Sequence, residues 1–366
     1  MNVREFLFEL PPELIAQDPP AVRGSSRLLH LDRRTGIRSH ATIDRIAGFL
    51  DPGDVVVVNN TRVFPARLLG RRDPSGGAVE CLLVSRVSGD ATPVASGFSR
   101  TSSEEVWQAL MHPGQKLAPG ARVVFEGAGA ATLHGEVLER HFHGRRSIRL
   151  WTGEGRSIQE VVDAIGHVPL PPYIKRGDRA EDRERYQTVF ARQRGSIAAP
   201  TAGLHFTPEI LASLKERGVQ LAEVTLHVGY GTFQPVRVDR VEDHRLDAEH
   251  YEVPTQTADV IEHARRAGRR VVAVGTTTTR TLEAAALAHG GRVAAGAGET
   301  DLFIYPGFEF RVVTGLLTNF HLPASSLIML VAAFGGTAAV MEAYADAIAK
   351  GYRFYSYGDA MLVTSP

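Results

Sequence analysis

Two short loops of this chain combine glycines, hydroxyl groups and a histidine each. The first runs from Ala199 to Thr207 and contains His205; the second, Val228–Phe233, follows His227 and reads Val-Gly-Tyr-Gly-Thr-Phe. Glycine lets a backbone approach a ligand closely, aromatic rings offer binding faces, and neutral imidazole can accept a proton. Each loop is also consistent with an ordinary turn, but two such loops joined by one helix and one strand favour a ligand site.

The segment between the loops predicts the elements that position them. Thr207 is suited to cap a helix that begins at Pro208 and ends before Gly218, the expected left-handed end residue. A strand over Gln220–His227 then leads into the second loop. The histidines therefore stand at opposite ends of one helix-strand unit.

Other polar groups follow predicted strands. The apolar run Val55–Val58 is typical of a strand buried on both faces, and ligands of open α/β sheets lie beyond strand ends. Gly275–Arg280 lies between a predicted strand, Arg270–Val274, and a helix over Thr281–Ala288. This is an anion-binding pattern, and equally an ordinary helix start. Further strands are predicted over Leu302–Tyr305 and Val312–Leu317. The polar residues in question are Asn59, Asn60, Arg62, Thr276, Thr277, Asn319, His321 and Ser325; satisfied polar turns are the alternative interpretation.

Composition limits the class of protein. A length of 366 residues predicts two domains, or one large domain with an insertion. A formal net charge of +0 gives no general attraction to nucleic acid or membrane, so an RNA contact requires local basic patches. One cysteine, Cys81, excludes an intrachain disulfide and a multi-cysteine metal site. The start does not read as a signal peptide and the run Leu327–Phe334 is too short to span a bilayer. We expect a cytoplasmic protein with no membrane contact and no bound metal.

The predicted secondary structure changes between Phe64 and Trp151. Short β-rich segments alternate there with Gly/Pro/Ser turns, which is typical of a small antiparallel barrel or sandwich. They cover Ala66–Arg71, Ala78–Arg86, Glu105–Met111, Arg122–Glu126, Thr132–Arg140 and Arg145–Trp151. We therefore predict an α/β fold: a mixed-sheet layered α/β domain formed by residues 1–62 and 153–366, with a small antiparallel β-barrel inserted at residues 63–152.

A charged segment follows a proline-rich connector. Arginines alternate with a tyrosine there, as contacts to a phosphate backbone and a flipped base require. A solvated charged face is the alternative interpretation. The candidates for RNA binding are Arg183, Arg185, Tyr186, Arg192 and Arg194.

Several longer segments resemble those of a known protein family. They include FELPPELIAQDP, DPGDVVVVNNTRVFPARLLGRR, GSIAAPTAGLHFT, VTLHVGYGTFQPVR, DLFIYPGF and LLTNFHLPASSLIMLVAAFGG. With these segments in order along nearly all of its length, the chain resembles the S-adenosylmethionine:tRNA ribosyltransferase-isomerases of queuosine biosynthesis. It departs from that family at Leu246-Asp247, where Met-His is usual, and at Gly275–Arg280, where Gly-Thr-Thr-Ser-Val-Arg is usual.

The resemblance implies a reaction and two partners. S-adenosylmethionine donates its ribosyl unit to the aminomethyl group of 7-aminomethyl-7-deazaguanine at the tRNA wobble position. Adenine and methionine leave, and the product is epoxyqueuosine-tRNA. No cofactor is implied beyond S-adenosylmethionine as co-substrate, and we expect a monomer. An S-adenosylmethionine-dependent RNA methyltransferase and a non-catalytic RNA-binding protein are the competing hypotheses.

That chemistry gives the candidate residues roles. The sulfonium acidifies the C5′ hydrogens, so a positioned base can form an ylide that expels adenine. The proton acceptors are His205, His227, His321 and Glu249, and we expect the histidines to share one cleft. Substrate-binding candidates are Asn60, Arg62, Thr201, Gly203, Gly229, Tyr230, Gly231, Thr232, Phe233, Thr276, Thr277, Asp301, Asn319, Ser325 and Asp359. Tyr230 and Phe233 are the rings expected to face the sulfonium.

Overall fold

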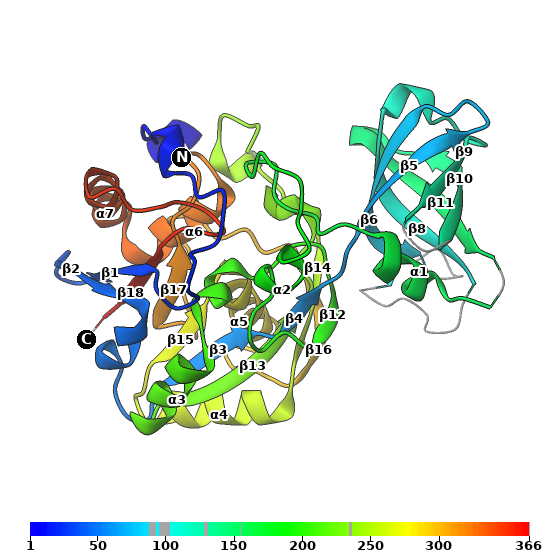
Figure 1. Cartoon of the computed structure of the whole chain (residues 1–366). Coiled ribbons are helices and arrows are strands. Elements are labelled where there is room, and N and C mark those ends of the chain that lie inside the picture. Colours follow the sequence, from blue (N-terminus) through cyan, green and yellow to red (C-terminus); the bar gives the residue numbers. More distant parts are fainter. Residues whose placement is uncertain (88–92, 95–102, 128–130, 154, 234–235, 366) are drawn as a thin grey trace.

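The computed structural model describes all of the chain except residues 88–92, 95–102, 128–130, 154, 234–235 and 366, and it leaves the side chains of 93–94, 143 and 232–233 undescribed. Two units are evident: a sheet flanked by helices, and a smaller barrel beside it (Figure 1). The barrel strands come from one continuous part of the chain, whereas the sheet takes strands from before and after it. The predicted fold class, an α/β domain with a small antiparallel barrel, is confirmed.

The larger unit is built on a mixed nine-stranded sheet. Its order is β16 (Gly296–Thr300), β14 (Glu249–Val253), β13 (Gln220–Leu226), β3 (Val55–Asn59), β15 (Val271–Val274), β17 (Gly315–Asn319), β18 (Ala360–Thr364), β1 (Arg27–Asp32) and β2 (Arg38–Thr42). The four central strands β13, β3, β15 and β17 are parallel. Their ends therefore meet at one edge, where ligands bind in such sheets.

Alternate valines of β3 enter two different cores. Val55 and Val57 pack with residues of α4 (Thr255–Arg266), α5 (Thr276–Ala288), α6 (Ser326–Gly335) and α7 (Thr337–Ala349). Val56 and Val58 pack instead with α3 (Pro208–Glu216) and the 3-10 helix η3 (Ile43–Phe49). Because successive strand residues face opposite sides, a continuous valine run lets both faces be covered.

The smaller unit is a closed six-stranded barrel. Its strands are β5 (Arg67–Asp73), β9 (Arg122–Glu126), β10 (Thr132–Arg140), β11 (Arg145–Thr152), β8 (Glu104–His112) and β6 (Ala78–Val87), and pairing of β5 with β6 closes the ring. A short strand, β7 (Pro93–Val94), adds to β6. All six predicted β segments are strands of this ring.

One helix of the barrel core lay outside the sequence prediction. Helix α1 (Ile158–Ile165) contributes Ile158, Val161 and Val162 to that core. Its capping box is Ser157 with Glu160: the Ser157 hydroxyl accepts from the Glu160 amide, and the Glu160 carboxylate accepts from the Ser157 amide. This Ser-x-x-Glu pattern is a sequence-level helix start. A short two-stranded sheet of β4 (Thr61–Val63) and β12 (Gln193–Ser196) lies between the two units.

Helix α5 begins five residues before the predicted start. The hydroxyls of Thr278, Thr279 and Thr281 donate to the carbonyl oxygens four residues earlier, at 2.8, 3.1 and 3.0 Å. Threonine can satisfy its hydroxyl inside a helix in this way. The threonine run is therefore the first turn of the helix instead of a loop before it.

The strand predicted over Leu302–Tyr305 was wrong. The strand in this region is β16, at Gly296–Thr300, and β17 begins only at Gly315. Side chains of α5 bind the backbone between them: Arg280 Nε donates to the Leu302 carbonyl at 2.8 Å, and Glu283 accepts from three consecutive amides, those of residues 311–313. These contacts replace the hydrogen bonds that a neighbouring strand would supply.

The run Leu327–Phe334 lies in α6, whose residues are largely buried against the sheet. Within the described part of the chain, no single helix has the length and apolar character to cross a membrane. The bent pair α6 and α7, with 115° between its helices, reaches that length and composition only when taken together.

Glu283 generates a prediction about stability. Its carboxylate is fully buried and accepts amide hydrogen bonds of 2.8, 3.0 and 2.8 Å. Glu283→Gln turns one acceptor into a donor facing these amides, so the free energy of unfolding should fall by about 2 kcal/mol in urea titrations. Glu342→Gln, which alters an exposed pair with Arg38, is the control and should cost at most about 1 kcal/mol. Equal effects of the two changes would contradict the anchoring role of Glu283.

Candidate active site

A cavity of about 380 Å³ lies beyond the ends of β15 and β17. We call it the strand-end cavity. Its wall combines the starts of α5 and α6 with the loop before η6 (Thr201–His205). Six predicted residues meet here although they come from three distant parts of the chain: Thr201, Thr276, Thr277, Asn319, His321 and Ser325.

The first turn of α5 suits an anion. Gly275, the residue before the helix, has φ of +90° and provides no side-chain cap. Helix α5 is 13 residues long, and its first residues line the cavity, so the partial positive charge of its amino end is directed there. The hydroxyls of Thr276 and Thr277 line the same place. A carboxylate can be held here by backbone amides and hydroxyls.

Unsatisfied polar atoms also mark this cavity. Among the described residues, Asn319 Oδ1 and the Tyr355 hydroxyl are buried and have no hydrogen-bond partner, and both residues line the cavity. Tyr355 has φ of 72° and Ala324, another lining residue, has φ of 53°. Unpaired buried polar groups and residues held in the left-handed region concentrate at functional sites. These features therefore favour a ligand in this cavity.

Two tyrosines form one wall. The rings of Tyr173 and Tyr355 stack with centroids 4.3 Å apart, and the Tyr173 hydroxyl lies 2.6 Å from Ser356 Oγ. Burial raises the pKa of Tyr173 well above its usual value, so its phenol stays protonated. The pair offers an aromatic face that can hold a flat or cationic ligand.

A second cavity of about 380 Å³ lies between the barrel and the α/β unit. We call it the junction cavity. Barrel residues such as Ser85, Gln108 and Arg145 form one wall, and the predicted residues His227, Gly229, Tyr230, Gly231 and Glu249 form the other. Val228 and Leu327 line both cavities. The two cavities are therefore neighbours, with a thin apolar partition between them.

Glu249 is the fixed charge of the junction cavity. One carboxylate oxygen accepts from the Gly229 amide at 2.7 Å, and the other accepts from the guanidinium of Arg280. Both members of this ion pair are buried, with side chains 8% and 7% exposed, so water screens them little. The pair joins the second glycine loop to α5 and leaves each carboxylate oxygen a lone pair for a ligand.

Contrary to the prediction, the three candidate histidines do not share one cleft. His321 lines the strand-end cavity, His227 lines the junction cavity, and His205 lines a separate cavity of about 20 Å³. His205 lies between Ser26 Oγ, 3.0 Å from Nδ1, and the side-chain amide of Asn319, 3.2 Å from Nε2. It therefore supports Asn319 from behind.

Burial sets the charge state of all three imidazoles. Desolvation lowers the pKa to about 4 for His205, about 4 for His227 and about 3 for His321. Each ring is therefore neutral near pH 7. His227 Nδ1 lies 2.9 Å from the Thr61 hydroxyl and His321 Nε2 lies 2.7 Å from that of Thr318, which orients both rings.

Other predicted substrate residues lie away from both cavities. Asn60 binds Glu223 and Thr225, and a side chain at Gly203 would meet Phe190 and Thr188 at 2.8 Å, so both positions serve packing. Asp359 is buried and accepts from Arg27 and from the Arg353 amide. Arg62 and Asp301 are exposed and line neither cavity. The side chains of Thr232 and Phe233 lie outside the described residues.

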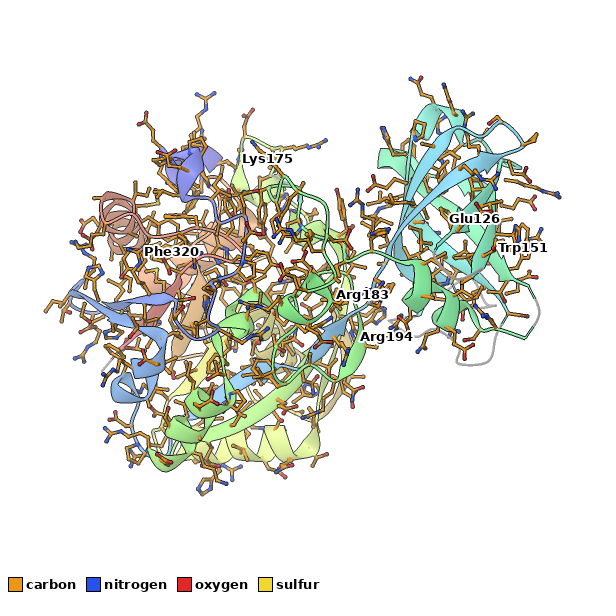
Figure 2. All side chains as sticks on the ribbon, viewed as in Figure 1. Glu126, Trp151, Lys175, Arg183, Arg194 and Phe320 are labelled. Atoms are coloured by element: carbon orange, nitrogen blue, oxygen red, sulfur yellow. The ribbon has the colours of Figure 1, made fainter. Side chains whose placement is uncertain are left out.

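The predicted RNA-binding segment is held by internal contacts, which its sequence did not reveal. Tyr186 is fully buried, so its ring offers no face to a base. Arg183 donates to the carbonyls of Asp163 and Gly166, Arg185 to that of Pro20, and Arg192 binds Glu223. Arg194 pairs with Asp163 at 2.7 Å. Figure 2 labels Arg183 and Arg194 at the edge of the α/β unit that faces the barrel.

Some lining residues were not among the predicted candidates: Pro172, Tyr173, Arg280, Leu327, Tyr355 and Ser356. Nothing in the local pattern around Tyr173 and Tyr355 distinguishes site tyrosines from core ones. For Arg280, the local signal was its place in the threonine-rich segment Gly275–Arg280. The sequence did not indicate its partner, because Glu249 lies far from it along the chain.

These features define an α/β protein with a β-barrel unit and two adjoining cavities that can each hold a ligand. A family described as queuosine biosynthesis protein matches residues 3–363, and the chain belongs to that family. S-adenosylmethionine:tRNA ribosyltransferase-isomerases are among its relatives. That of Heliobacterium modesticaldum is 48% identical over 364 residues, covering 99% of this chain and 100% of the relative. That of Geobacter metallireducens is 49% identical over 365 residues, with the same coverage.

A solved structure agrees with this assignment. The crystal structure of an S-adenosylmethionine tRNA ribosyltransferase from Thermotoga maritima is similar to this chain, with 39% identity and a TM-score of 0.53. The match covers 98% of this chain and 99% of that one. The family resemblance that the sequence segments indicated is thereby confirmed.

His321 generates a prediction about pH. Its pKa is about 3 in the folded protein, against about 6.5 when unfolded. The stability gained by burying the neutral ring is complete above about pH 6.5 and is lost as the pH falls toward the folded pKa. Compared with His321→Gln, the wild type should lose about 1.4 kcal/mol of unfolding free energy per pH unit between about pH 6 and 4. Urea titrations across this range measure the difference, with about pH 7–8 as the internal reference; parallel pH curves would contradict a buried neutral ring.

Proposed function

We propose that this chain is an S-adenosylmethionine:tRNA ribosyltransferase-isomerase. It transfers the ribosyl unit of S-adenosylmethionine to 7-aminomethyl-7-deazaguanine at the tRNA wobble position and rearranges it, giving epoxyqueuosine-tRNA, adenine and methionine. The main support in the structure is the pair of adjoining cavities that share Val228 and Leu327. A sugar passing between two ligands needs both to be held side by side.

S-adenosylmethionine occupies the strand-end cavity in this proposal. The amino end of α5 and its threonine hydroxyls suit the methionine carboxylate. The stacked Tyr173 and Tyr355 suit the adenine ring or the sulfonium cation, and a cation facing a ring gains about 0.5–2 kcal/mol. Asn319 Oδ1 and the Tyr355 hydroxyl then find the partners that they lack. No other cofactor enters the proposal.

The acceptor base occupies the junction cavity. Tyr230 offers a ring against which a flipped base can stack, and the buried Glu249 carboxylate can accept hydrogen bonds from the donors of a deazaguanine or its aminomethyl group. Its ion pair with Arg280 holds this carboxylate in place. The aminomethyl nitrogen then lies near the partition that separates it from the sugar.

The proton transfer that starts the reaction fits a neutral histidine in the strand-end cavity. His321 can take a proton from the C5′ carbon next to the sulfonium. In the resulting ylide the C5′ electron pair forms a C4′–C5′ double bond, the C4′–O4′ bond breaks, O4′ becomes the carbonyl oxygen on C1′, and adenine leaves C1′ and takes the proton back from the imidazolium. When the ylide forms it has no net charge and the imidazole becomes positive, so the net charge of the cavity does not change in that step. A desolvated site opposes the creation of charge far more than its relocation. His227, in the other cavity, is closer to the acceptor amine in this arrangement.

We also propose that residues 63–152 act as a barrel domain inserted into the α/β domain formed by residues 1–62 and 153–366. The junction cavity takes walls from both parts, so the insertion serves the acceptor site. We further propose that the protein works as a monomer in the cytoplasm, where its proposed tRNA substrate is found.

Product analysis tests the proposed reaction. Incubation with S-adenosylmethionine and tRNA bearing the aminomethyl-deazaguanine base should release adenine and methionine in equal amounts, as measured by chromatography and mass spectrometry. The same base in the tRNA should gain the mass of the rearranged ribosyl unit. S-adenosylhomocysteine as the product would instead identify a methyltransferase, and unchanged substrates would identify a binding protein.

Two substitutions test the assignment of the cavities. Asn319→Ala should weaken S-adenosylmethionine binding about fivefold or more in calorimetry, because it removes a polar group from that cavity and the support that His205 gives it. Glu249→Gln should leave that binding near wild type and lower turnover about 100-fold, because a weaker acceptor remains at the base. The opposite pattern would place S-adenosylmethionine in the junction cavity.

A further inference from the structure

A third hollow runs along the boundary between the barrel and the α/β unit. Its volume of about 880 Å³ is more than twice that of either cavity, each about 380 Å³. One side consists of barrel residues from β5, β6 and β8, and the other of the proline-rich connector and residues 237–238 and 243–245. We call it the basic groove, because its charged residues are Arg67, Arg176, Arg237 and Arg245 against Glu80 and Asp243.

The groove is continuous with the candidate active site. Tyr230 lines both the groove and the junction cavity, and Pro172 lines both the groove and the strand-end cavity. A polymer lying in the groove can therefore deliver one unit past Tyr230 to Glu249 without crossing the protein core. A small ligand would need no such extended approach.

Two of the four arginines have their charge neutralised within the protein. Arg67 Nε donates to the Glu80 carboxylate at 2.7 Å, and Arg176 binds the buried Asp182 carboxylate through two hydrogen bonds, of 2.7 and 2.9 Å. Burial and these contacts hold Arg176 in place, so it shapes the groove. Neither guanidinium is the main binding charge for a partner.

The other two arginines keep their charge for a partner. Arg237 and Arg245 are both exposed. The hydrogen bonds of Arg245 Nη1 go to neutral carbonyl oxygens, those of Glu242 at 2.6 Å and His244 at 2.8 Å. Within the part of the chain that the structure describes, Arg237 forms no ion pair. Asp243 lines the same wall, so its exposed charges are two guanidinium groups and one carboxylate, a net positive charge that suits an anion.

An exposed aromatic side chain lies two residues along the chain from Gly144, a residue that lines the groove on the barrel side. Phe142 is 88% exposed, and it belongs to the 3-10 helix η5 (Phe142–Gly144), whose last residue, Gly144, lines the groove. A fully exposed phenylalanine gains nothing from its position in the folded chain alone. Exposed aromatic rings next to arginines are the recognition elements for unstacked bases.

From these observations we infer that the basic groove is the binding surface for the anticodon arm of tRNA. Arg237 and Arg245 bind backbone phosphates there, Phe142 stacks on a base of the loop, and the wobble nucleotide passes Tyr230 into the junction cavity. This inference rests on the proposed function and assigns its RNA contacts to the groove instead of the internally paired segment that contains Arg183 and Arg194.

The test measures binding of the full-length protein to an unmodified tRNA transcript with guanine at the wobble position. The double variant Arg237→Glu with Arg245→Glu should raise Kd about tenfold or more in fluorescence anisotropy at about 0.1 M salt. The slope of log K against log salt should fall in magnitude by about 0.7–0.9 for each phosphate that the variant no longer neutralises.

The control makes the same charge change elsewhere. Arg34 and Arg45 are exposed and belong to the turn after β1 and to η3, at the edge of the sheet opposite the barrel (Figure 1). The double variant Arg34→Glu with Arg45→Glu should keep the wild-type Kd within about twofold and the wild-type salt slope. An equal weakening of binding in both double variants would show a general charge effect and overturn the assignment of the groove.

Substitutions of Phe142 distinguish the contribution of stacking to tRNA binding from that of charge. Phe142→Ala should weaken tRNA binding about fivefold or more with the salt slope unchanged, and Phe142→Tyr should restore it. Thermal unfolding and S-adenosylmethionine binding should match the wild type in every variant, which shows that the fold and the strand-end cavity are intact. A Phe142→Ala protein with wild-type affinity would remove the ring from the RNA footprint.

An incorrect assignment of the groove and an incorrect proposed function give different experimental results. If the wild type transfers ribosyl units while the groove variants bind tRNA normally, the assignment of the groove to tRNA binding is wrong and the proposed function stands. If the wild type neither binds tRNA nor releases adenine, the function itself is wrong. If a polyglutamate peptide binds the wild type as tightly as tRNA does and is weakened equally in the groove variants, the groove fits an acidic protein and the RNA assignment is overturned.

Discussion

The buried side-chain amide of Asn59 ties together the ends of two neighbouring strands. Its oxygen accepts from the amides of Thr61 and Leu226, both at 3.1 Å, and its nitrogen donates to the Leu226 carbonyl at 2.9 Å. The same nitrogen lies 3.5 Å from Thr277 Oγ1. An unpaired buried amide is costly, so these bonds fix where the chain leaves β3 and β13. Val228, the wall common to both cavities, lies two residues after Leu226 and depends on this arrangement.

Buried carboxylates perform the same task at other strand ends. Glu283 holds three backbone amides before β17, Asp359 joins the Arg27 and Arg353 segments, and Glu249 fixes the Gly229 amide beside α5. Ionised acceptors make stronger hydrogen bonds than neutral ones, and a buried site keeps them unscreened. Side-chain hydrogen bonds thereby tie the loops that line the cavities to the neighbouring strands and helices.

The barrel supplies part of the walls of the junction cavity and of the basic groove. Residues of the α/β unit line the strand-end cavity, whereas the junction cavity and the basic groove each include barrel residues, such as Gln108 and Arg67. The junction cavity and the basic groove therefore lie at the boundary between the two units, a common kind of place for binding sites. A separate barrel also gives a long substrate a second surface to contact without any change in the sheet.

The sequence by itself determined most of the strands and helices and several of the residues that line one cavity. The valine run of β3, the turn residues of the barrel and the caps of α3 act locally, so their pattern predicts strands and helices directly. Polar residues after parallel strands, such as Thr277 and Asn319, met in the strand-end cavity because parallel strands end at one edge.

Only the tertiary structure decided which charged and aromatic groups are available to a ligand. Arg194 and Tyr186 read as RNA contacts, yet Asp163 neutralises the first and the core encloses the second. His205 reads as a base, yet Ser26 and Asn319 enclose it behind the site. Availability depends on partners that folding brings from distant parts of the chain. Their pairing and desolvation energies arise only at contact, and no local pattern of residues records them.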